Sequence, residues 1–124
     1  MSLGLNAPPF PVVVHHNEAC GTSRGVVELI RAAGHEPVII DYLNDGWTRG
    51  QLLALFAAAN LTPRQALREK NSPAEELGLL AEGVADSAIL DAMVAHPVLV
   101  NRPIVPTPKG VRLCRPKELV LELV

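Results

Sequence analysis

The residues best suited to chemistry form one short run, Cys20-Gly21-Thr22-Ser23. The run follows an apolar segment, Val12 to Val14, that is typical of a β-strand, and it precedes a segment from Arg24 to Ala33 that is typical of a helix. A thiol at a helix N-terminus lies beside free backbone N–H groups and the positive end of the helix dipole. Such a position lowers the pKa of a thiol from ~8.5 to between ~3.5 and ~7.5. We therefore expect Cys20 to be a nucleophile near neutral pH.

The second cysteine, Cys114, lies in an apolar segment with Val111 and Leu113, and we expect it to be a packing residue. The chain begins without a basic segment followed by an apolar core, so no secretory leader is predicted. Two reduced thiols in the cytoplasm are therefore expected rather than a disulfide. No metal site is predicted, because the histidines are scattered at His15, His16, His35 and His96.

Length and composition predict one globular domain. The chain has 124 residues, of which 48% are apolar and 19% are charged. We expect residues 1–11 to be a disordered lead-in and residues 12–124 to form the single domain. The net charge of −2 gives no reason to expect nucleic acid as a partner, and no apolar run approaches the ~20 residues that a membrane helix needs.

The elements that must hold Cys20 follow from apolar patterns and capping signals. A buried second strand is predicted over 37–41, parallel to the first strand through a right-handed crossover, with Gly34 ending the helix between them. Capping boxes predict helices that begin after Thr48, Thr62 and Ser72. A fourth helix of this middle region is expected to open at Asp86 or Ser87, with Ile89, Leu90, Met93 and Val94 on one face.

The C-terminal part predicts a hairpin and a helix. Strands are expected over 103–106 and 111–114 around a turn at 107–110, and Pro116 is expected to open the last helix. The resulting order, βαβ…ββα, is that of an α/β, thioredoxin-like fold. In this chain a helical insertion stands between the second and third strands.

Several separated motifs then carry a family resemblance. They are His16-Asn17-Glu18-Ala19-Cys20-Gly21-Thr22-Ser23-Arg24, Glu76-Leu77-Gly78-Leu79, His96-Pro97, Asn101-Arg102-Pro103-Ile104-Val105 and Arg112-Leu113-Cys114-Arg115-Pro116. In this order the chain resembles the glutathione/glutaredoxin-coupled arsenate reductases from about residue 13 to its C-terminus.

The resemblance implies a reaction without a tightly bound cofactor. The Cys20 thiolate would attack arsenate and form a Cys–S–arsenate adduct. Glutathione would then attack this adduct, glutaredoxin would resolve the mixed disulfide, and arsenite would leave. Ser23 fits such a scheme, because it stands where a second cysteine would permit an internal disulfide.

The resemblance also implies roles for particular residues. Arg68, Arg102 and Arg115 match the three substrate arginines, whose planar guanidinium groups suit an oxyanion. His16 and Ser23 match residues that lower the pKa of the cysteine by positive charge and hydrogen bonding. The Arg102–Pro103 bond corresponds to the X–Pro bond that thioredoxin-like folds keep cis beside the active thiol.

One departure and two alternatives remain open. Glu18 stands where the family commonly has proline, and its carboxylate would oppose thiolate formation if it faced the site but matter little if it faced solvent.

The chain could instead be a thioredoxin-fold regulatory protein that docks on RNA polymerase, although Ser23 in place of a second cysteine argues against this. It could also be a glutathione-dependent thiol protein with another substrate.

Overall fold

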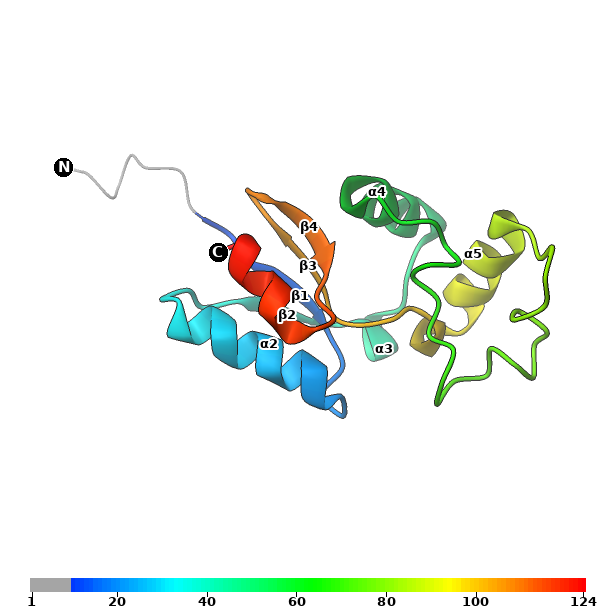
Figure 1. Ribbon diagram of the computed structural model, residues 1–124, viewed down its shortest axis with the longest axis horizontal. Coiled ribbons are helices and arrows are strands. Elements are labelled where there is room, and N and C mark those ends of the chain that lie inside the picture. Colours follow the sequence, from blue (N-terminus) through cyan, green and yellow to red (C-terminus); the bar gives the residue numbers. More distant parts are fainter. Residues whose placement is uncertain (1–9) are drawn as a thin grey trace.

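The computed structural model describes residues 10–124, and its centre is a mixed β-sheet (Figure 1). Within the described residues the sheet has the strand order β2-β1-β3-β4. Strands β1 and β2 are parallel, whereas β3 is antiparallel to both β1 and β4. The strands are β1 (Val13–His16), β2 (Val38–Asp41), β3 (Ile104–Thr107) and β4 (Gly110–Leu113). Most of the predicted lead-in lies outside the described residues.

Helix α2 (Gly21–Ala32) connects the two parallel strands, and Cys20 is its N-cap. Gly34 follows the C-cap Ala33, and its φ of +93° is accessible to glycine at little cost. Gly34 N–H donates to the Arg31 carbonyl and His35 N–H to the Ile30 carbonyl, which is the hydrogen-bond pattern of a Schellman motif. The predicted βαβ unit and its glycine stop are therefore confirmed.

The two faces of the sheet bury different clusters, because successive side chains of a strand point to opposite sides. On one face Val14 and Val105 lie in a cluster with residues of α2 and of the 3₁₀ helix η2 (Lys117–Glu122). On the other face Ile104 joins the larger cluster, and the His15 ring lies 5.0 Å from that of Trp47. The order βαβ…ββα and this layering confirm the predicted thioredoxin-like fold.

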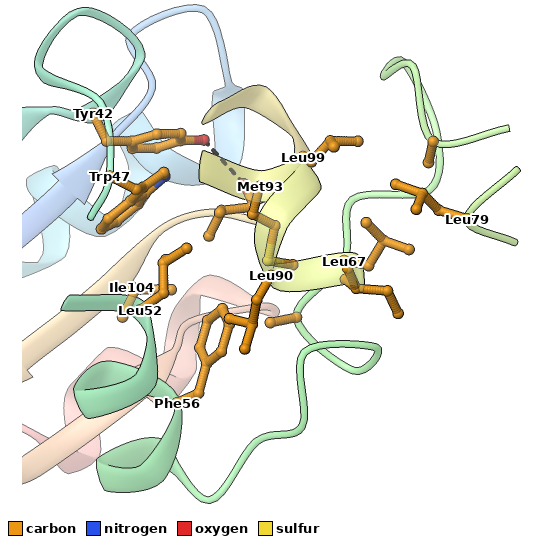
Figure 2. Packing of buried hydrophobic residues seen from close by; sticks show 14 residues of the cluster. Tyr42, Trp47, Leu52, Phe56, Leu67, Leu79, Leu90, Met93, Leu99 and Ile104 are labelled. Carbon is orange, nitrogen blue, oxygen red and sulfur yellow. Dashed lines mark hydrogen bonds between the residues drawn. The ribbon is translucent and has the colours of Figure 1, made fainter. Parts of the chain in front are cut away.

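The larger cluster joins the sheet to the helical part of the chain (Figure 2). That part contains α3 (Tyr42–Asp45), α4 (Arg49–Ala59), α5 (Asp86–Ala95) and the 3₁₀ helix η1 (Pro97–Leu99). Helix α4 begins as predicted, with the Thr48 hydroxyl accepting from Gln51 N–H at 3.1 Å. Figure 2 shows Tyr42 and Trp47 at one end of the cluster and Leu67 and Leu79 at the other.

The prediction of a buried second strand is wrong. Within residues 10–124 strand β2 lies at an edge of the sheet, where it pairs with β1 alone. Its residues Val38 and Ile39 are 56% and 41% exposed. An apolar run shows that a segment favours a strand, but whether that strand is central depends on pairings made by residues far away in the sequence.

The helix predicted after Thr62 does not form, although its capping box does. The Thr62 hydroxyl accepts from Gln65 N–H at 3.2 Å, and the Gln65 side chain accepts from Thr62 N–H at 2.9 Å. Only one turn follows, because Leu67 then bridges to Val100 in antiparallel fashion. Tertiary pairing thus ends the helix that the local signal starts.

The helix predicted after Ser72 is also replaced by turns. The Ser72 hydroxyl accepts from Ala74 N–H at 3.2 Å, and one helical turn follows in which Leu77 N–H donates to the Pro73 carbonyl. Gly78 then takes a φ of +73°, which a helix does not tolerate. The side chains of this segment still reach the larger cluster through Ala74 and Leu79.

The two remaining helices differ from expectation in detail. Helix α5 begins at Asp86 with Ala85 as its N-cap, and Val94 is 38% exposed although the other three predicted inward residues are buried. The last helix is the 3₁₀ helix η2, with Pro116 as its N-cap rather than within it. No helix in residues 10–124 is both long and apolar enough to span a membrane.

Candidate active site

The sulfur of Cys20 lies at the start of α2 among several hydrogen-bond donors. Burial raises the pKa of this thiol, but the Ser23 backbone N–H, the Arg102 and Arg115 side chains and the Thr22 backbone N–H near the sulfur each lower it. Together these donors outweigh burial and lower the pKa of Cys20 to about 7. A thiol with this pKa has a substantial thiolate fraction at neutral pH.

Hydrogen bonds within the preceding loop fix the position of Cys20. The Asn17 carbonyl accepts from Cys20 N–H at 2.9 Å, and the Asn17 side chain accepts from Ala19 N–H at 3.0 Å. The Ser23 hydroxyl, which is fully buried, accepts from Asn17 N–H at 3.1 Å. Ser23 thus has two contacts: its backbone N–H faces the sulfur, and its hydroxyl holds the loop.

Arg115 connects the thiol to the loop before β3. Its Nη1 lies 3.7 Å from the Cys20 sulfur and donates to the Arg102 carbonyl at 3.1 Å. Arg102 is only 8% exposed, and its Nε and Nη1 have no hydrogen-bond partner among the described residues. The Arg102–Pro103 bond is cis, as the resemblance implies, and so is Arg115–Pro116, which was not predicted.

Arg68 comes from the segment where a helix was predicted, and it reaches the same region. Its Nε donates to the Lys70 carbonyl at 2.7 Å, and its Nη1 lies 3.5 Å from the Asn101 side-chain oxygen. Burial lowers the pKa of Arg68, and the nearby charges of Arg102 and Arg115 lower it further. The positive charges of Arg102 and Arg115 near Arg68 make a setting that favours an added negative charge.

A hollow of about 350 Å³ opens beside these groups. It is lined by Gln65, Leu67, Arg68, Glu69, Lys70, Asn101 and Arg115. Within the described residues none of the three predicted arginines forms an ion pair with a carboxylate, whereas Arg31, Arg49 and Arg112 each do. Three guanidinium groups without counter-charges, gathered near a thiol, form a site that can bind an oxyanion.

His16 is buried at the end of β1, but it makes no hydrogen bond to Cys20. Its Nε2 lies 2.8 Å from a carboxylate oxygen of Glu18, and its Nδ1 has no partner among residues 10–124. The Glu18 side chain is 81% exposed. Of the two alternatives for Glu18, the structure therefore shows the solvent-facing one.

A second hollow, of about 220 Å³, lies on the other side of this loop, between α2 and β2. It is lined by His16, Glu18, Arg24, Val27, Glu28, Arg31 and Ile39. Its two arginines are balanced by two glutamates, and Arg31 is further paired with Glu36 at 3.0 Å. The lining of this second hollow therefore carries no net positive charge, whereas arginine and lysine outnumber glutamate in the lining of the first.

Cys114 is buried at the end of β4, in the cluster under α2. Burial raises the pKa of Cys114 to about 12, so its thiol stays protonated at neutral pH. The predicted packing residue is thus observed. In the described part of the chain no group of three or more His, Cys, Asp or Glu side chains is placed to hold a metal ion.

Three polar residues of this region were not predicted as site residues. Asn17 organises the nucleophile loop, and Asn101 contacts both Arg68 and the Arg102 backbone. The Tyr42 hydroxyl donates to the Val100 carbonyl at 3.2 Å (Figure 2), and burial raises its pKa to about 12. Asn17 and Asn101 stand beside predicted residues in the sequence, which is the only local signal. Tyr42 is distant and needs the fold.

Comparison with known proteins gives consistent matches over nearly the whole domain. Residues 15–123 match the model of the ArsC family. An arsenate reductase, ArsI2, from Synechocystis sp. is 65% identical over 112 residues, which are 90% of this chain and 80% of that protein. The arsenate reductase of Escherichia coli (strain K12) is 49% identical over 112 residues, 90% of this chain and 79% of that protein. The structure of an arsenate reductase from Vibrio cholerae superposes with a TM-score of 0.88 at 34% identity and covers 94% of this chain and 100% of that one.

Proposed function

The chain belongs to the ArsC family, and from this premise we propose that it is an arsenate reductase that takes its electrons from glutathione and glutaredoxin. The observation that carries the proposal is the gathering of unpaired arginines beside a thiol whose pKa is lowered to about 7. Arsenate is a tetrahedral oxyanion, so it needs both parts of this site: donors for its oxygens and a nucleophile for its arsenic.

In the first step Arg68, Arg102 and Arg115 hold the oxyanion beside the sulfur. Arg102 is mostly buried, and its Nε and Nη1 have no hydrogen-bond partner among the described residues, so its charge is available to offset that of the oxyanion. The Cys20 thiolate then forms a bond to arsenic, and one oxygen leaves as water or hydroxide. Arsenic remains at oxidation state five in this adduct, and the guanidinium groups offset the charge of the attacking sulfur and the oxyanion.

The electrons for the reduction come from two thiols outside the chain. Glutathione attacks the Cys20 sulfur of the adduct, so that a Cys20–glutathione disulfide forms, the sulfur–arsenic bond breaks, and arsenic keeps the electron pair and leaves as arsenite. Glutaredoxin then reduces the mixed disulfide and restores the Cys20 thiol. In sum, one arsenate and two thiols give one arsenite, one disulfide and water. Two observations favour external thiols: Ser23 replaces a second cysteine near Cys20, and Cys114 is buried with a pKa of about 12. A cytoplasmic location, where glutathione is reduced, belongs to the same proposal.

His16 and Ser23 are proposed to support the nucleophile. Ser23 acts through its backbone N–H on the sulfur and through its hydroxyl on the loop. His16 lies at the base of the same loop, next to Asn17, and a positive charge on its ring would favour the thiolate.

The test is arsenite production from arsenate with different electron donors. We expect turnover with glutathione, glutaredoxin and glutathione reductase, and none with thioredoxin and thioredoxin reductase. Turnover with thioredoxin alone would contradict the proposed donor and leave the arsenate reductase assignment in place. No arsenite with either donor would contradict the activity itself.

A further inference from the structure

The side chain of Asn101 connects two of the three arginines. Its Oδ1 lies 3.5 Å from Nη1 of Arg68 and accepts from the backbone N–H of Arg102 at 3.1 Å. Both neighbours are donors, so the atom that faces them must be the carbonyl oxygen of the amide. The orientation of the Asn101 amide is therefore determined by its hydrogen bonds.

This orientation turns the NH2 group of Asn101 away from its two neighbours. Among the described residues Nδ2 has no hydrogen-bond partner, and it is not one of the buried atoms that lack one. It is therefore accessible to solvent, and Asn101 lines the hollow together with Arg68 and Arg115. A neutral donor thus stands among cationic donors on the wall of the same hollow.

The backbone of Asn101 holds this donor in a fixed position. Asn101 N–H donates to the Ala66 carbonyl at 2.8 Å, and in the neighbouring pair Arg68 N–H donates to the Leu99 carbonyl at 2.7 Å. The buried Tyr42 hydroxyl holds the adjacent Val100 carbonyl at 3.2 Å. A donor fixed before the ligand arrives loses little conformational freedom on binding.

We propose that Asn101 is a further oxyanion-binding residue, whose NH2 group donates to an arsenate oxygen while its carbonyl holds Arg68 and the Arg102 backbone. The proposal rests on the proposed function for the identity of the oxyanion. It differs from a purely structural role, in which Asn101 would act only by positioning Arg68.

A double-mutant cycle distinguishes the two roles. The readout is the concentration of arsenate, or of phosphate as an oxyanion that is not reduced, that halves the rate of Cys20 alkylation by iodoacetamide. No glutathione is present, so the assay reports binding without turnover. Asn101→Ala is measured in the wild-type protein and in Arg68→Ala. Asn44→Ala, which removes an exposed asparagine that bonds to Asp41, is the matched control.

We expect Asn101→Ala to raise the half-protecting concentration about tenfold in both backgrounds, because a hydrogen bond to a charged ligand is lost. Asn44→Ala should leave it unchanged. Each half-protecting concentration is measured relative to the same variant's alkylation rate without anion, so that a change in the reactivity of Cys20 itself does not enter the comparison. A penalty that disappears in the Arg68→Ala background would overturn the proposal, and so would the absence of a penalty.

Asn101→Asp tests the same proposal in a variant that keeps both acceptor contacts. A carboxylate still accepts from Arg68 and Arg102, but it lacks the donor and repels the oxyanion, so protection should weaken about 100-fold. Unchanged protection would contradict the proposal. Protection of wild-type Cys20 without arsenite production would contradict only the proposed function, whereas no protection by either anion would overturn the present inference whatever the turnover.

Discussion

The surroundings of the two cysteines differ although both thiols belong to the same half of the fold. Cys20 lies at the open end of α2, where backbone N–H groups and two arginines face its sulfur. Cys114 lies at the end of β4, within the apolar cluster that α2 and η2 cover. Burial raises the pKa of both thiols, yet the pKa of Cys20 falls to about 7 and that of Cys114 rises to about 12. The surrounding donors therefore account for the difference in pKa between the two thiols.

The largest expected difference between the two regions is in turnover. Cys20→Ser should lower the rate of arsenite production by at least ~1,000-fold, because it removes the nucleophile. Cys114→Ser should keep the rate within about twofold. Both rates are measured with saturating arsenate, glutathione and glutaredoxin. Equal losses of turnover in the two variants would show that the difference between the surroundings of Cys20 and Cys114 does not explain activity.

A smaller but still large effect is expected for a donor to the Cys20 sulfur. Arg115→Ala removes a side chain that contacts both the sulfur and the Arg102 carbonyl, so kcat/KM should fall about 100-fold and the pKa of Cys20 should rise. Arg112→Ala is the matched control, because Arg112 pairs with Glu122 away from the thiol. An unchanged pKa of Cys20 in Arg115→Ala would show that Arg115 does not stabilise the thiolate.

For the free energy of unfolding, in contrast to turnover, the substitution of Cys114 should have the larger effect. Cys114→Ala leaves a space in a packed cluster and should lower the free energy of unfolding by about 1 kcal/mol. Cys20→Ala removes a partly exposed thiol and should change it by less than about 0.5 kcal/mol. Urea denaturation measures both values. A larger loss in Cys20→Ala would mean that the sulfur has a structural role as well.

The smallest effect is expected at Glu18. Its carboxylate faces solvent and His16 rather than the sulfur, so Glu18→Gln should change kcat/KM by less than about threefold. A marked increase in activity, together with a lower pKa of Cys20, would show that the carboxylate opposes thiolate formation.

Much of the fold could be predicted from local patterns, and two of the three main errors arise from pairings between residues distant in the sequence. The strand before Cys20, helix α2 with its glycine stop and the C-terminal hairpin follow from periodicity and turn residues. The exposed edge position of β2 depends on the order of the strands, which is decided by pairings distant in sequence. The helices predicted after Thr62 and Ser72 fail because the Leu67–Val100 bridge and Gly78 end them after one turn.

Some residues of the candidate site could likewise be predicted from the local sequence, whereas others could not. The location of Cys20 at a helix start follows from neighbouring residues alone. Nothing local distinguishes Arg68 from Arg49 or Arg64, and its choice came from the resemblance. The place of Asn101 beside Arg102 is visible in the sequence, but its contact with Arg68 requires the fold, because it joins positions 33 residues apart. The catalytic and binding roles of these residues remain predictions.

The central claim is that the environment of Cys20, and not that of Cys114, makes a thiolate at neutral pH. The most direct test is the alkylation rate of each cysteine in the folded protein between pH 5 and pH 9, followed by mass spectrometry. Because only the thiolate reacts, the Cys20 rate should rise about tenfold per pH unit at low pH and level off above a pKa of about 7, while Cys114 stays unmodified. A Cys20 rate that still rises through pH 8.5, or modification of Cys114 at a similar rate, would contradict the claim.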